Sequence, residues 1–274
     1  MEAAQRHILL TGATGGIGAA IAKALAARGT RLTLVARNPE RLQRLADSLA
    51  QLCSGVATVA ADLAAPGAAG GVVAHAAVAQ GDIDVLVNCA GINDFGRFAN
   101  AAPDRIEALI ATNLLAPVQL TRAALPGMLT RGRGRIVNVG SVMGGVGFAG
   151  FGVYCATKFG LRGFSEALRR ELRGSGVSVA YIAPRYTRTT LNTVAMDRMA
   201  QAVRMNTDTP ETAASAIAAA VDGMKADHVI GLVERLLVRM NGLLPGFVDI
   251  SLAKLNRRMV EHAELEHHIA EGKV

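Results

Sequence analysis

The strongest constraint on the fold of this chain is a regular alternation of short apolar runs with longer segments of helical periodicity. The apolar runs predict strands at His7–Leu10, Arg31–Ala36, Val56–Ala60, Ile83–Asn88, Arg135–Val139, Val177–Ile182 and His228–Leu232. The intervening segments predict helices at Gly16–Arg28, Pro39–Leu52, Ala68–Gln80, Pro103–Met128, Phe151–Arg173 and Pro210–Met224. Apolar strands separated by helices form parallel sheets that are buried on both faces. We therefore predict a doubly wound α/β fold, with a seven-stranded parallel sheet and helices on both faces.

Composition narrows the classes of function. The chain has 274 residues, of which 51% are hydrophobic, and this apolar content predicts an ordered protein. The net charge is +7, but basic residues do not alternate with aromatic ones, so we expect no nucleic-acid partner. The three cysteines share no metal-ligand spacing, which predicts no metal site, reduced thiols and a cytoplasmic location. No run approaches the ~20 apolar residues of a spanning helix, and no signal peptide precedes the first strand.

A glycine-rich turn follows the first predicted strand directly. It reads Thr11-Gly12-Ala13-Thr14-Gly15-Gly16-Ile17-Gly18 and leads into an Ala/Leu-rich helical segment. Glycines in this position permit a tight turn and a close approach of a pyrophosphate to the backbone, and the helix N-terminus supplies free N–H groups. Three residues separate the first two important glycines, so the spacing differs from G-x-G-x-x-G. We expect the turn to bind a dinucleotide through Gly12, Thr14, Gly16, Ile17 and Gly18.

Further motifs follow in a fixed order. They are Asn88-Cys89-Ala90-Gly91 after the fourth strand, Asn113 in the next helix, Ser141 after the fifth strand, and Tyr154-Cys155-Ala156-Thr157-Lys158. With the glycine-rich turn TGxxxGIG, they make residues 7 to about 190 resemble the short-chain dehydrogenase/reductase family. The resemblance implies a Rossmann-type fold and a nicotinamide cofactor that contacts Asn88, Ala90 and Gly91. We also expect a homodimer or homotetramer.

Tyr154 and Lys158 are four residues apart in a predicted helix, so their side chains share one face. A nearby ammonium group lowers the pKa of a phenol from its usual value of about 10, which suits proton transfer. Ser141, at the end of a strand, is placed to hydrogen-bond a substrate carbonyl oxygen. The resemblance implies these catalytic roles. It further implies that Lys158 holds the nicotinamide ribose and that Asn113 supports a water-mediated proton relay.

The end of the second strand predicts which dinucleotide binds. A carboxylate there would accept a hydrogen bond from the ribose 2′-hydroxyl and repel a 2′-phosphate, but this strand continues as Arg37-Asn38. Arg37 offers a planar donor fork to a phosphate, with Asn38 as a helper, so we expect NADP(H). Asp62 and Leu63 resemble the adenine contact of the family, although Asp62 is equally placed to cap the following helix.

The segment after the sixth strand reads Pro184-Arg185-Tyr186-Thr187-Arg188-Thr189, where the family has Pro-Gly followed by a threonine. The resemblance implies that Pro184, Thr187 and Thr189 contact the cofactor, with Thr189 at the nicotinamide carboxamide. Arg185 stands where the family has this glycine. If the glycine has a positive φ, an arginine there would be strained, so the backbone conformation at Arg185 is left open. Two alternatives remain for Arg185 and Arg188: they bind an anionic group of the substrate, or they pair with neighbouring acids.

The substrate side and the C-terminal segment complete the prediction. The run 142–151 carries no charge, which favours a substrate with an apolar body. We divide the chain into a dinucleotide-binding and catalytic domain, residues 1–232, and a helical extension, residues 233–274. An interfacial membrane helix, a dimer arm and an active-site cover are all compatible with the extension. A packing arm is favoured, because its basic residues are balanced by acids.

These features together predict an NADP(H)-dependent oxidoreductase. It would reduce a carbonyl group of a ketone, aldehyde or keto-acyl compound to an alcohol, with Tyr154 as proton donor. One alternative is a dehydrogenase that oxidises an apolar secondary alcohol with the same residues. The other is a nucleotide-sensing protein without turnover, but such a protein would not need Ser141.

Overall fold

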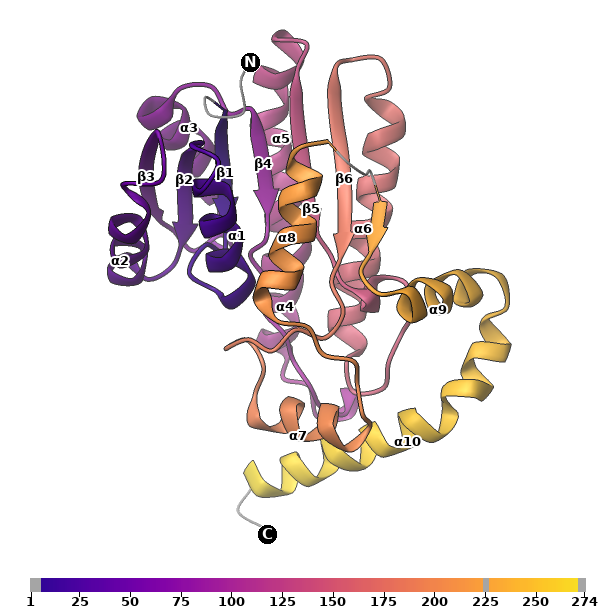
Figure 1. Ribbon diagram of the computed structural model, residues 1–274. Coiled ribbons are helices and arrows are strands. Elements are labelled where there is room, and N and C mark those ends of the chain that lie inside the picture. Colours follow the sequence, from indigo (N-terminus) through magenta and orange to yellow (C-terminus); the bar gives the residue numbers. More distant parts are fainter. Residues whose placement is uncertain (1–5, 224–226, 271–274) are drawn as a thin grey trace.

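The computed structural model describes residues 6–223 and 227–270, with side chains as far as Glu264. Its centre is a seven-stranded parallel sheet in the order β3-β2-β1-β4-β5-β6-β7 (Figure 1). The strands are β1 (His7–Thr11), β2 (Arg31–Ala36), β3 (Gly55–Ala60), β4 (Val85–Asn88), β5 (Gly134–Val139), β6 (Val177–Ala183) and β7 (Asp227–Val229). The predicted doubly wound parallel sheet is confirmed.

The strand order reverses between β1 and β4. β1 pairs with β2 on one side, where Ile8 lies opposite Leu32, and with β4 on the other, where Ile8 lies opposite Val85. The chain therefore runs outward from β1 to β3 and then returns to the other side of β1. At such a switch point, the loops beyond the carboxyl ends of the two strands diverge and leave a crevice between them.

Helices cover both faces of the sheet. One face carries α1 (Gly16–Ala26), α2 (Pro39–Leu49) and α8 (Pro210–Val221). The other carries α3 (Ala68–Gln80), α4 (Pro103–Ile110), the π-helical turn η3 (Ala111–Leu115), α5 (Ala116–Thr130) and α6 (Gly152–Glu171). Two short 3-10 helices, η2 (Phe98–Asn100) and η4 (Val142–Gly144), and helix α7 (Val194–Ala202) lie in the loops.

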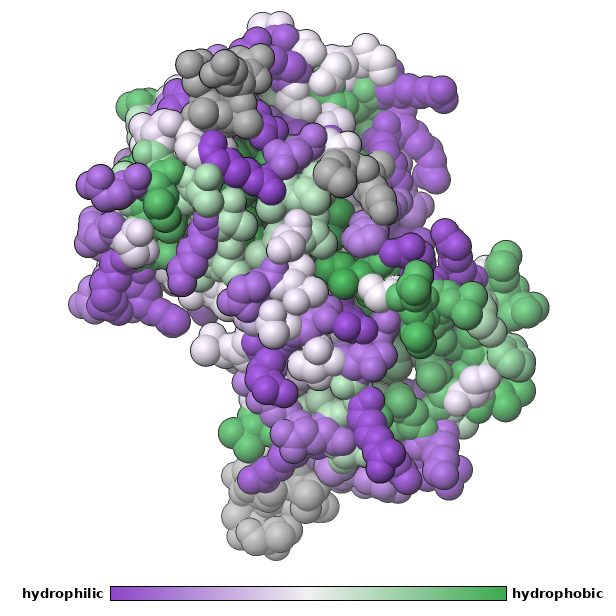
Figure 2. All heavy atoms as spheres, in the orientation of Figure 1, coloured by the Kyte–Doolittle hydropathy of each residue, from purple (hydrophilic) through white to green (hydrophobic). Residues whose placement is uncertain are grey.

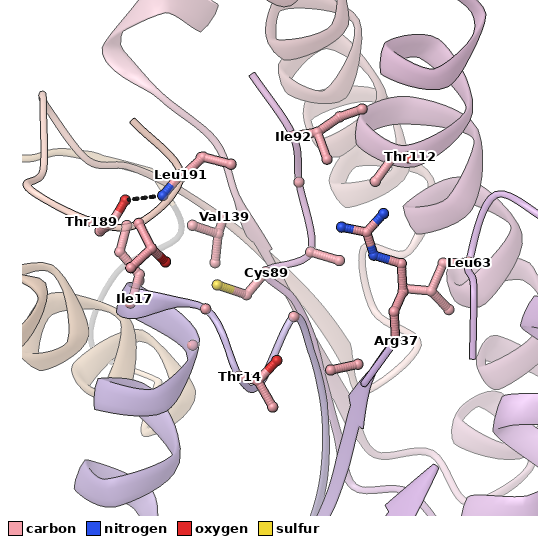
Figure 3. Close-up of a pocket in the computed structure, with 18 of the residues that line it drawn as sticks. Thr14, Ile17, Arg37, Leu63, Cys89, Ile92, Thr112, Val139, Thr189 and Leu191 are labelled. Atoms are coloured by element: carbon pink, nitrogen blue, oxygen red, sulfur yellow. Dashed lines mark hydrogen bonds between the residues drawn. The ribbon is translucent and has the colours of Figure 1, made fainter. Parts of the chain in front are cut away.

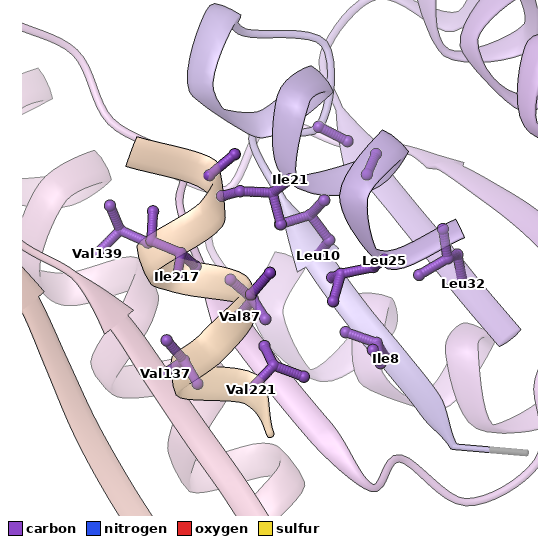
Figure 4. Packing of buried hydrophobic residues seen from close by; sticks show 14 of the residues in the cluster. Ile8, Leu10, Ile21, Leu25, Leu32, Val87, Val137, Val139, Ile217 and Val221 are labelled. Carbon is purple, nitrogen blue, oxygen red and sulfur yellow. The ribbon is translucent and has the colours of Figure 1, made fainter. Parts of the chain in front are cut away.

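The larger core lies between α1, α8 and the sheet (Figure 4). Ile21 of α1 and Ile217 of α8 point toward the strands, where they meet side chains such as Leu10 and Val87. All four side chains are fully buried. Burying a side chain of this size contributes about 1.5–3 kcal/mol. This packing fixes α1, and with it the glycine-rich turn, against the end of β1.

The structure differs from the predicted elements in several places. The helix predicted at 103–128 is interrupted by η3, and α7 was not predicted. The last strand ends at Val229 and not at Leu232, because Gly231 has φ +93° and turns the chain into the next helix. By length and composition alone, Pro103–Thr130 could cross a membrane, but its Leu120 and Met128 are buried in the core on the sheet.

The C-terminal extension forms two helices, α9 (Leu232–Leu243) and α10 (Pro245–Ala270). They meet at an elbow and run across the carboxyl-end side of the sheet (Figure 1). Val238 of α9 and Val248 of α10 are buried against Val142 and Val146. Farther along α10, Met259 packs against Met196 and Met199 of α7. One side of the extension is therefore anchored on the rest of the fold.

Candidate active site

The glycine-rich turn is packed so tightly that larger residues do not fit. Gly12 has φ +67°, and a Cβ there would lie 2.7 Å from the Cα of Ala90. A Cβ on Gly16 would lie 2.7 Å from the Thr189 methyl group, and one on Gly18 only 2.0 Å from the Gly12 carbonyl oxygen. The first turn of α1 therefore approaches the strand ends closely and leaves its backbone N–H groups open to a ligand.

Thr11 joins the two loops that diverge at the switch point. Its hydroxyl oxygen accepts hydrogen bonds from the backbone N–H groups of Cys89 and Ala90, both at 3.1 Å. Ala90 and Gly91 consequently line the cavity above β1 and β4. The side chain of Asn88 does not: its amide donates to Asn138 at 2.8 Å inside the core. Asn88 thus supports the loop from inside the core and does not border the cavity.

The cavity has a volume of about 380 Å³ and extends from the glycine-rich turn along the ends of the strands. Figure 3 shows Arg37 and Leu63 on one side, Ile17 and Thr189 on the other, and Cys89 between them. The cavity is lined by most of the predicted cofactor residues, namely Gly12, Thr14, Gly16, Ile17, Gly18, Arg37, Asn38, Asp62, Leu63, Ala90, Gly91, Tyr154, Lys158 and Thr189. The cradle of glycines and the arginine at one end fit an elongated phosphate-bearing dinucleotide.

Two polar residues at the Arg37 end also have local structural roles. The Asn38 carboxamide caps α2 by accepting a hydrogen bond from the N–H of Arg41 at 2.8 Å. Asp62 accepts from the N–H of Ala64 at 3.0 Å, so it stabilises the turn after β3 and also borders the cavity. The sequence reasoning missed Arg41, which lines the cavity beside Arg37. Its place in the first turn of α2, four residues after Arg37, was the available signal.

Tyr154 and Lys158 lie one turn apart on α6 and both line the cavity, as their spacing predicted. The Lys158 ammonium is buried, donates to the Val139 carbonyl at 3.1 Å, and lies 5.7 Å from the centre of the Tyr154 ring. Burial lowers the pKa of Lys158 to about 8. Most of the Lys158 side chains are therefore still protonated and charged at neutral pH.

The pKa of Tyr154 departs from the sequence-based expectation. Burial raises it to about 12, and the neighbouring Ser141 hydroxyl opposes this rise. Lys158 was expected to lower this pKa, but its buried ammonium is directed to the carbonyl of Val139. The phenol is therefore protonated at neutral pH, which is the state of a proton donor.

Ser141 is held in place by a residue that the sequence reasoning missed. The Tyr181 hydroxyl, from β6, accepts from the Ser141 N–H and donates to the Ser141 carbonyl, both at 3.3 Å. A Cβ on Gly140 or Gly144 would collide with the Tyr181 ring or hydroxyl. A tyrosine in a buried strand needs a partner for its hydroxyl, and that requirement was the only signal in the sequence.

Asn113 sits in the π-helical turn η3, and such turns are frequent at functional sites. Its side-chain oxygen accepts from the N–H of Ile92 at 2.8 Å, and its amide donates to the Ile92 carbonyl at 2.9 Å. A Cβ on Gly91 would lie 3.3 Å from the Asn113 oxygen and 3.8 Å from the Lys158 ammonium nitrogen. Asn113 therefore lies beside Lys158, as its predicted role requires.

The loop after β6 decides between the alternatives for Arg185. Its guanidinium lies 2.7 Å from the Asp208 carboxylate and 3.6 Å from that of Glu234, so the pairing with acids is the correct interpretation. The Arg185 backbone is not left-handed, because Arg204 is the only non-glycine residue with positive φ in the described chain. Arg188 is exposed and borders a separate polar cleft together with Arg204.

The other residues of this loop are divided between two cavities. Thr189 borders both the cofactor cavity and a second cavity, whereas Pro184 and Thr187 border only the second. Thr187 is buried, and its hydroxyl donates to the Arg185 carbonyl at 3.0 Å. The structure thus places Pro184 and Thr187 outside the cavity for which they were predicted.

The second cavity, of about 260 Å³, lies on the far side of Tyr154. Ser141 and Tyr154 form its reactive end. Apolar side chains from η4, its following loop, the loop after α7 and the extension form much of its wall, among them Val142, Met143, Phe148, Met205, Leu237, Leu252 and Leu255. The extension therefore contributes to the cavity wall, a role that sequence reasoning left among several alternatives. The arrangement can place an apolar molecule between Ser141, Tyr154 and a dinucleotide.

The fold, the glycine cradle and the Ser-Tyr-Lys arrangement define a dehydrogenase or reductase that binds a dinucleotide. The chain belongs to the short-chain dehydrogenase family, whose pattern it matches over residues 6–200. It is 31% identical to the ketoacyl reductase HetN of a Nostoc species, over 97% of this chain and 96% of that protein. It is 34% identical to the dehydrogenase/reductase SDR family member 7B of Bos taurus, over 92% of this chain and 81% of that protein.

Solved structures agree with this assignment. A short-chain dehydrogenase from Streptomyces avermitilis superposes with a TM-score of 0.78 and 30% identity, over 94% of this chain and 99% of that one. A short-chain dehydrogenase from Sphingobium yanoikuyae in complex with NADPH has a TM-score of 0.76 and 30% identity, over 89% of this chain and 95% of that one.

Proposed function

We propose that this protein reduces the carbonyl group of an apolar compound to an alcohol and uses NADPH as the reductant. The observation that carries the proposal is the position of Tyr154, whose side chain borders both the glycine-lined cavity and the apolar cavity. A single phenol at the junction of two cavities can deliver a proton to a substrate in one while a dinucleotide occupies the other.

In the proposed mechanism, the Ser141 hydroxyl and the Tyr154 phenol together hydrogen-bond the carbonyl oxygen and orient the carbonyl carbon toward the dinucleotide cavity. When bound, NADPH supplies a hydride to that carbon. The proton of Tyr154 passes to the oxygen, so the product is a neutral alcohol and the tyrosine is left as a phenolate. Lys158, which lines the dinucleotide cavity one helical turn from Tyr154, is placed to hold the bound dinucleotide. Asn113, beside Lys158, is placed to support reprotonation of the phenolate through water.

The direction of the reaction is supported by the pKa of Tyr154. A phenol already carries its proton at neutral pH at its ordinary pKa of about 10, and burial, which raises the pKa of Tyr154 to about 12, further favours this protonated form. Reduction requires this protonated form, whereas oxidation of an alcohol requires the phenolate as base. We therefore favour the reductive direction over the oxidation of a secondary alcohol.

The preference for NADPH rests on Arg37 and Arg41, which line the same end of the cavity. Two guanidinium groups there can pair with a ribose 2′-phosphate. Relatives support the proposal: a Salmonella typhi protein, 39% identical over 65% of this chain, is called an NADP-dependent 3-hydroxy acid dehydrogenase. A metagenomic short-chain oxidoreductase, 31% identical with a TM-score of 0.70, was solved with NADP.

Further parts of the proposal concern location and assembly. The free state of all three cysteines is compatible with work in the reducing cytoplasm. Exposed Ile110, Leu115 and Phe159 lie on the helical layer formed by α4, η3 and α6, and they support self-association into a homodimer or homotetramer.

The proposal is tested by following NADPH oxidation with a panel of carbonyl compounds, from alkyl ketones to charged keto acids. We expect the highest kcat/KM with an uncharged apolar ketone or aldehyde. Tyr154→Phe should lower kcat by about 100-fold or more, because the proton donor is lost. NADPH binding, measured by its fluorescence, serves as the control and should be retained. Turnover by Tyr154→Phe at the wild-type rate would refute the mechanism.

A further inference from the structure

The C-terminal extension carries a large apolar surface that no described part of the chain covers. We call this surface the apolar elbow; it comprises Leu232, Val233 and Leu236 on α9, Leu243 and Leu244 at the turn, and Phe247 and Ile250 on α10. Leu243 is 80% exposed and Ile250 is 79% exposed. Figure 2 shows hydrophobic side chains gathered over α9 and the start of α10. Contiguous apolar surfaces of this kind mark interaction sites.

The apolar elbow is separate from the face that anchors the extension. Leu232, Leu236 and Leu243 recur at intervals of four and seven residues, which places them on one stripe of α9. The residue that anchors α9 is Val238, which is buried against Val142. In α10, Val248 is likewise buried, whereas its neighbours Phe247 and Ile250 are exposed. Both helices are thus apolar on two faces, and only one of these faces is used for packing.

Basic side chains border the apolar elbow. Arg239 lies between Leu236 and Leu243 on α9, while Lys254 and Arg257 follow Ile250 by one and two turns on the same face of α10. All three are exposed, and none pairs with a carboxylate among the described residues. We call these three residues the basic collar. Asp249 is the exposed acid inside this region, so the collar and Asp249 together carry a net positive charge of about two.

We propose that the apolar elbow inserts into the interfacial layer of an anionic membrane, with the basic collar on the lipid headgroups. Large apolar side chains flanked by Lys and Arg, which extend their charges toward the headgroups, suit this interface. The attraction of lysine and arginine to anionic lipids adds to apolar insertion. A symmetric contact with a second copy of the chain fits less well, because it would bring two basic collars together.

The location of the apolar elbow connects this inference to the catalytic site. The same two helices line the apolar cavity through Leu237, Leu252 and Leu255. A membrane that contacts the elbow would therefore lie against the outer side of the cavity wall. Membrane binding does not require turnover, so the inference and the proposed reaction can fail independently.

The test is flotation of the full-length protein with vesicles of phosphatidylcholine, with and without phosphatidylserine. We expect wild-type protein to float with anionic vesicles, and to float less when the salt concentration is raised, because salt screens the collar. The triple variant Leu243→Glu, Phe247→Glu, Ile250→Glu should lower the bound fraction at least about tenfold. Val78→Glu is the matched control, since Val78 is 90% exposed on α3, and it should float like wild type.

A second variant separates charge from apolar insertion. Lys254→Glu with Arg257→Glu should weaken binding to anionic vesicles about tenfold or more and leave the weaker binding to neutral vesicles unchanged. Circular dichroism and turnover of a soluble substrate verify that each variant is folded. The inference is overturned if wild type stays with the soluble fraction, or if the triple variant floats as wild type does. A dimer that dissociates in the triple variant, without flotation of wild type, would instead assign the apolar elbow to a second copy.

Discussion

Substituting Gly18 with Ala sets two physical effects against each other. Gly18 lies in the first turn of α1, where alanine is favoured over glycine by about 1 kcal/mol in helix propensity. In this structure, however, a Cβ on Gly18 would lie 2.0 Å from the Gly12 carbonyl oxygen and 2.8 Å from its carbon. Both atoms belong to the backbone of the tight turn after β1, so neither can move away as a side chain would.

The magnitude follows from the required displacement. The Gly12 carbonyl oxygen must retreat by about 1.3 Å, from 2.0 Å to about 3.3 Å, the short end of ordinary carbon–oxygen contacts. Overpacking of this kind costs about 3 kcal/mol, at the upper end of its usual range. Subtracting the gain of about 1 kcal/mol in propensity leaves a net loss of about 2 kcal/mol. For a chain of this size, that loss lowers Tm by about 4–8 °C.

The assay is thermal unfolding without cofactor, followed by titration with NADPH. Gly163→Ala is the matched control, because Gly163 lies in α6 and a Cβ there would meet no atom within 4 Å. This variant should gain about 1 kcal/mol and about 2–4 °C in Tm. Gly18→Ala should also weaken NADPH binding, since its turn must open. The reasoning is refuted if Gly18→Ala raises Tm as Gly163→Ala does.

Three further predictions concern charged groups. Arg37→Ala should lower kcat/KM for NADPH about 10- to 100-fold and leave the value for NADH nearly unchanged. Arg44→Ala, at an exposed position of the following helix α2, is the control, and equal losses with both nucleotides would contradict the proposal. Arg185→Ala leaves the buried Asp208 carboxylate without its partner at 2.7 Å, so urea unfolding should show a loss of about 3 kcal/mol, and Asp208→Asn in that background should restore part of it. Burial lowers the pKa of His7 below its ordinary value of 6.5, so the unfolded chain binds the proton more readily and stability should decline as pH falls below about 6.5. His7→Gln should show a smaller decline in urea titrations between pH values of about 7.5 and 5.5, and an identical decline would exclude His7 as the cause.

The parts of the site that could be predicted depend on residues close together in the chain. Tyr154 and Lys158 share one face of α6 because they are one helical turn apart, and Gly12 and Gly18 meet because both belong to one tight turn. The pKa of Tyr154 could not be predicted in the same way. It depends on burial and on Ser141, which lies 13 positions earlier and is held by Tyr181 from another strand.

By itself, the sequence determined the alternation of strands and helices, the glycine-rich turn and the spacing of the candidate catalytic residues. These features follow from periodicity and steric constraints between near neighbours, which act whatever the rest of the chain does. The tertiary structure alone decided that Arg185 pairs with Asp208 and Glu234, and that Pro184 and Thr187 border the second cavity and not the cofactor cavity. It also decided which face of α9 and α10 packs and which remains exposed. Such outcomes depend on how distant elements pack together, and the local pattern of residues does not specify that packing.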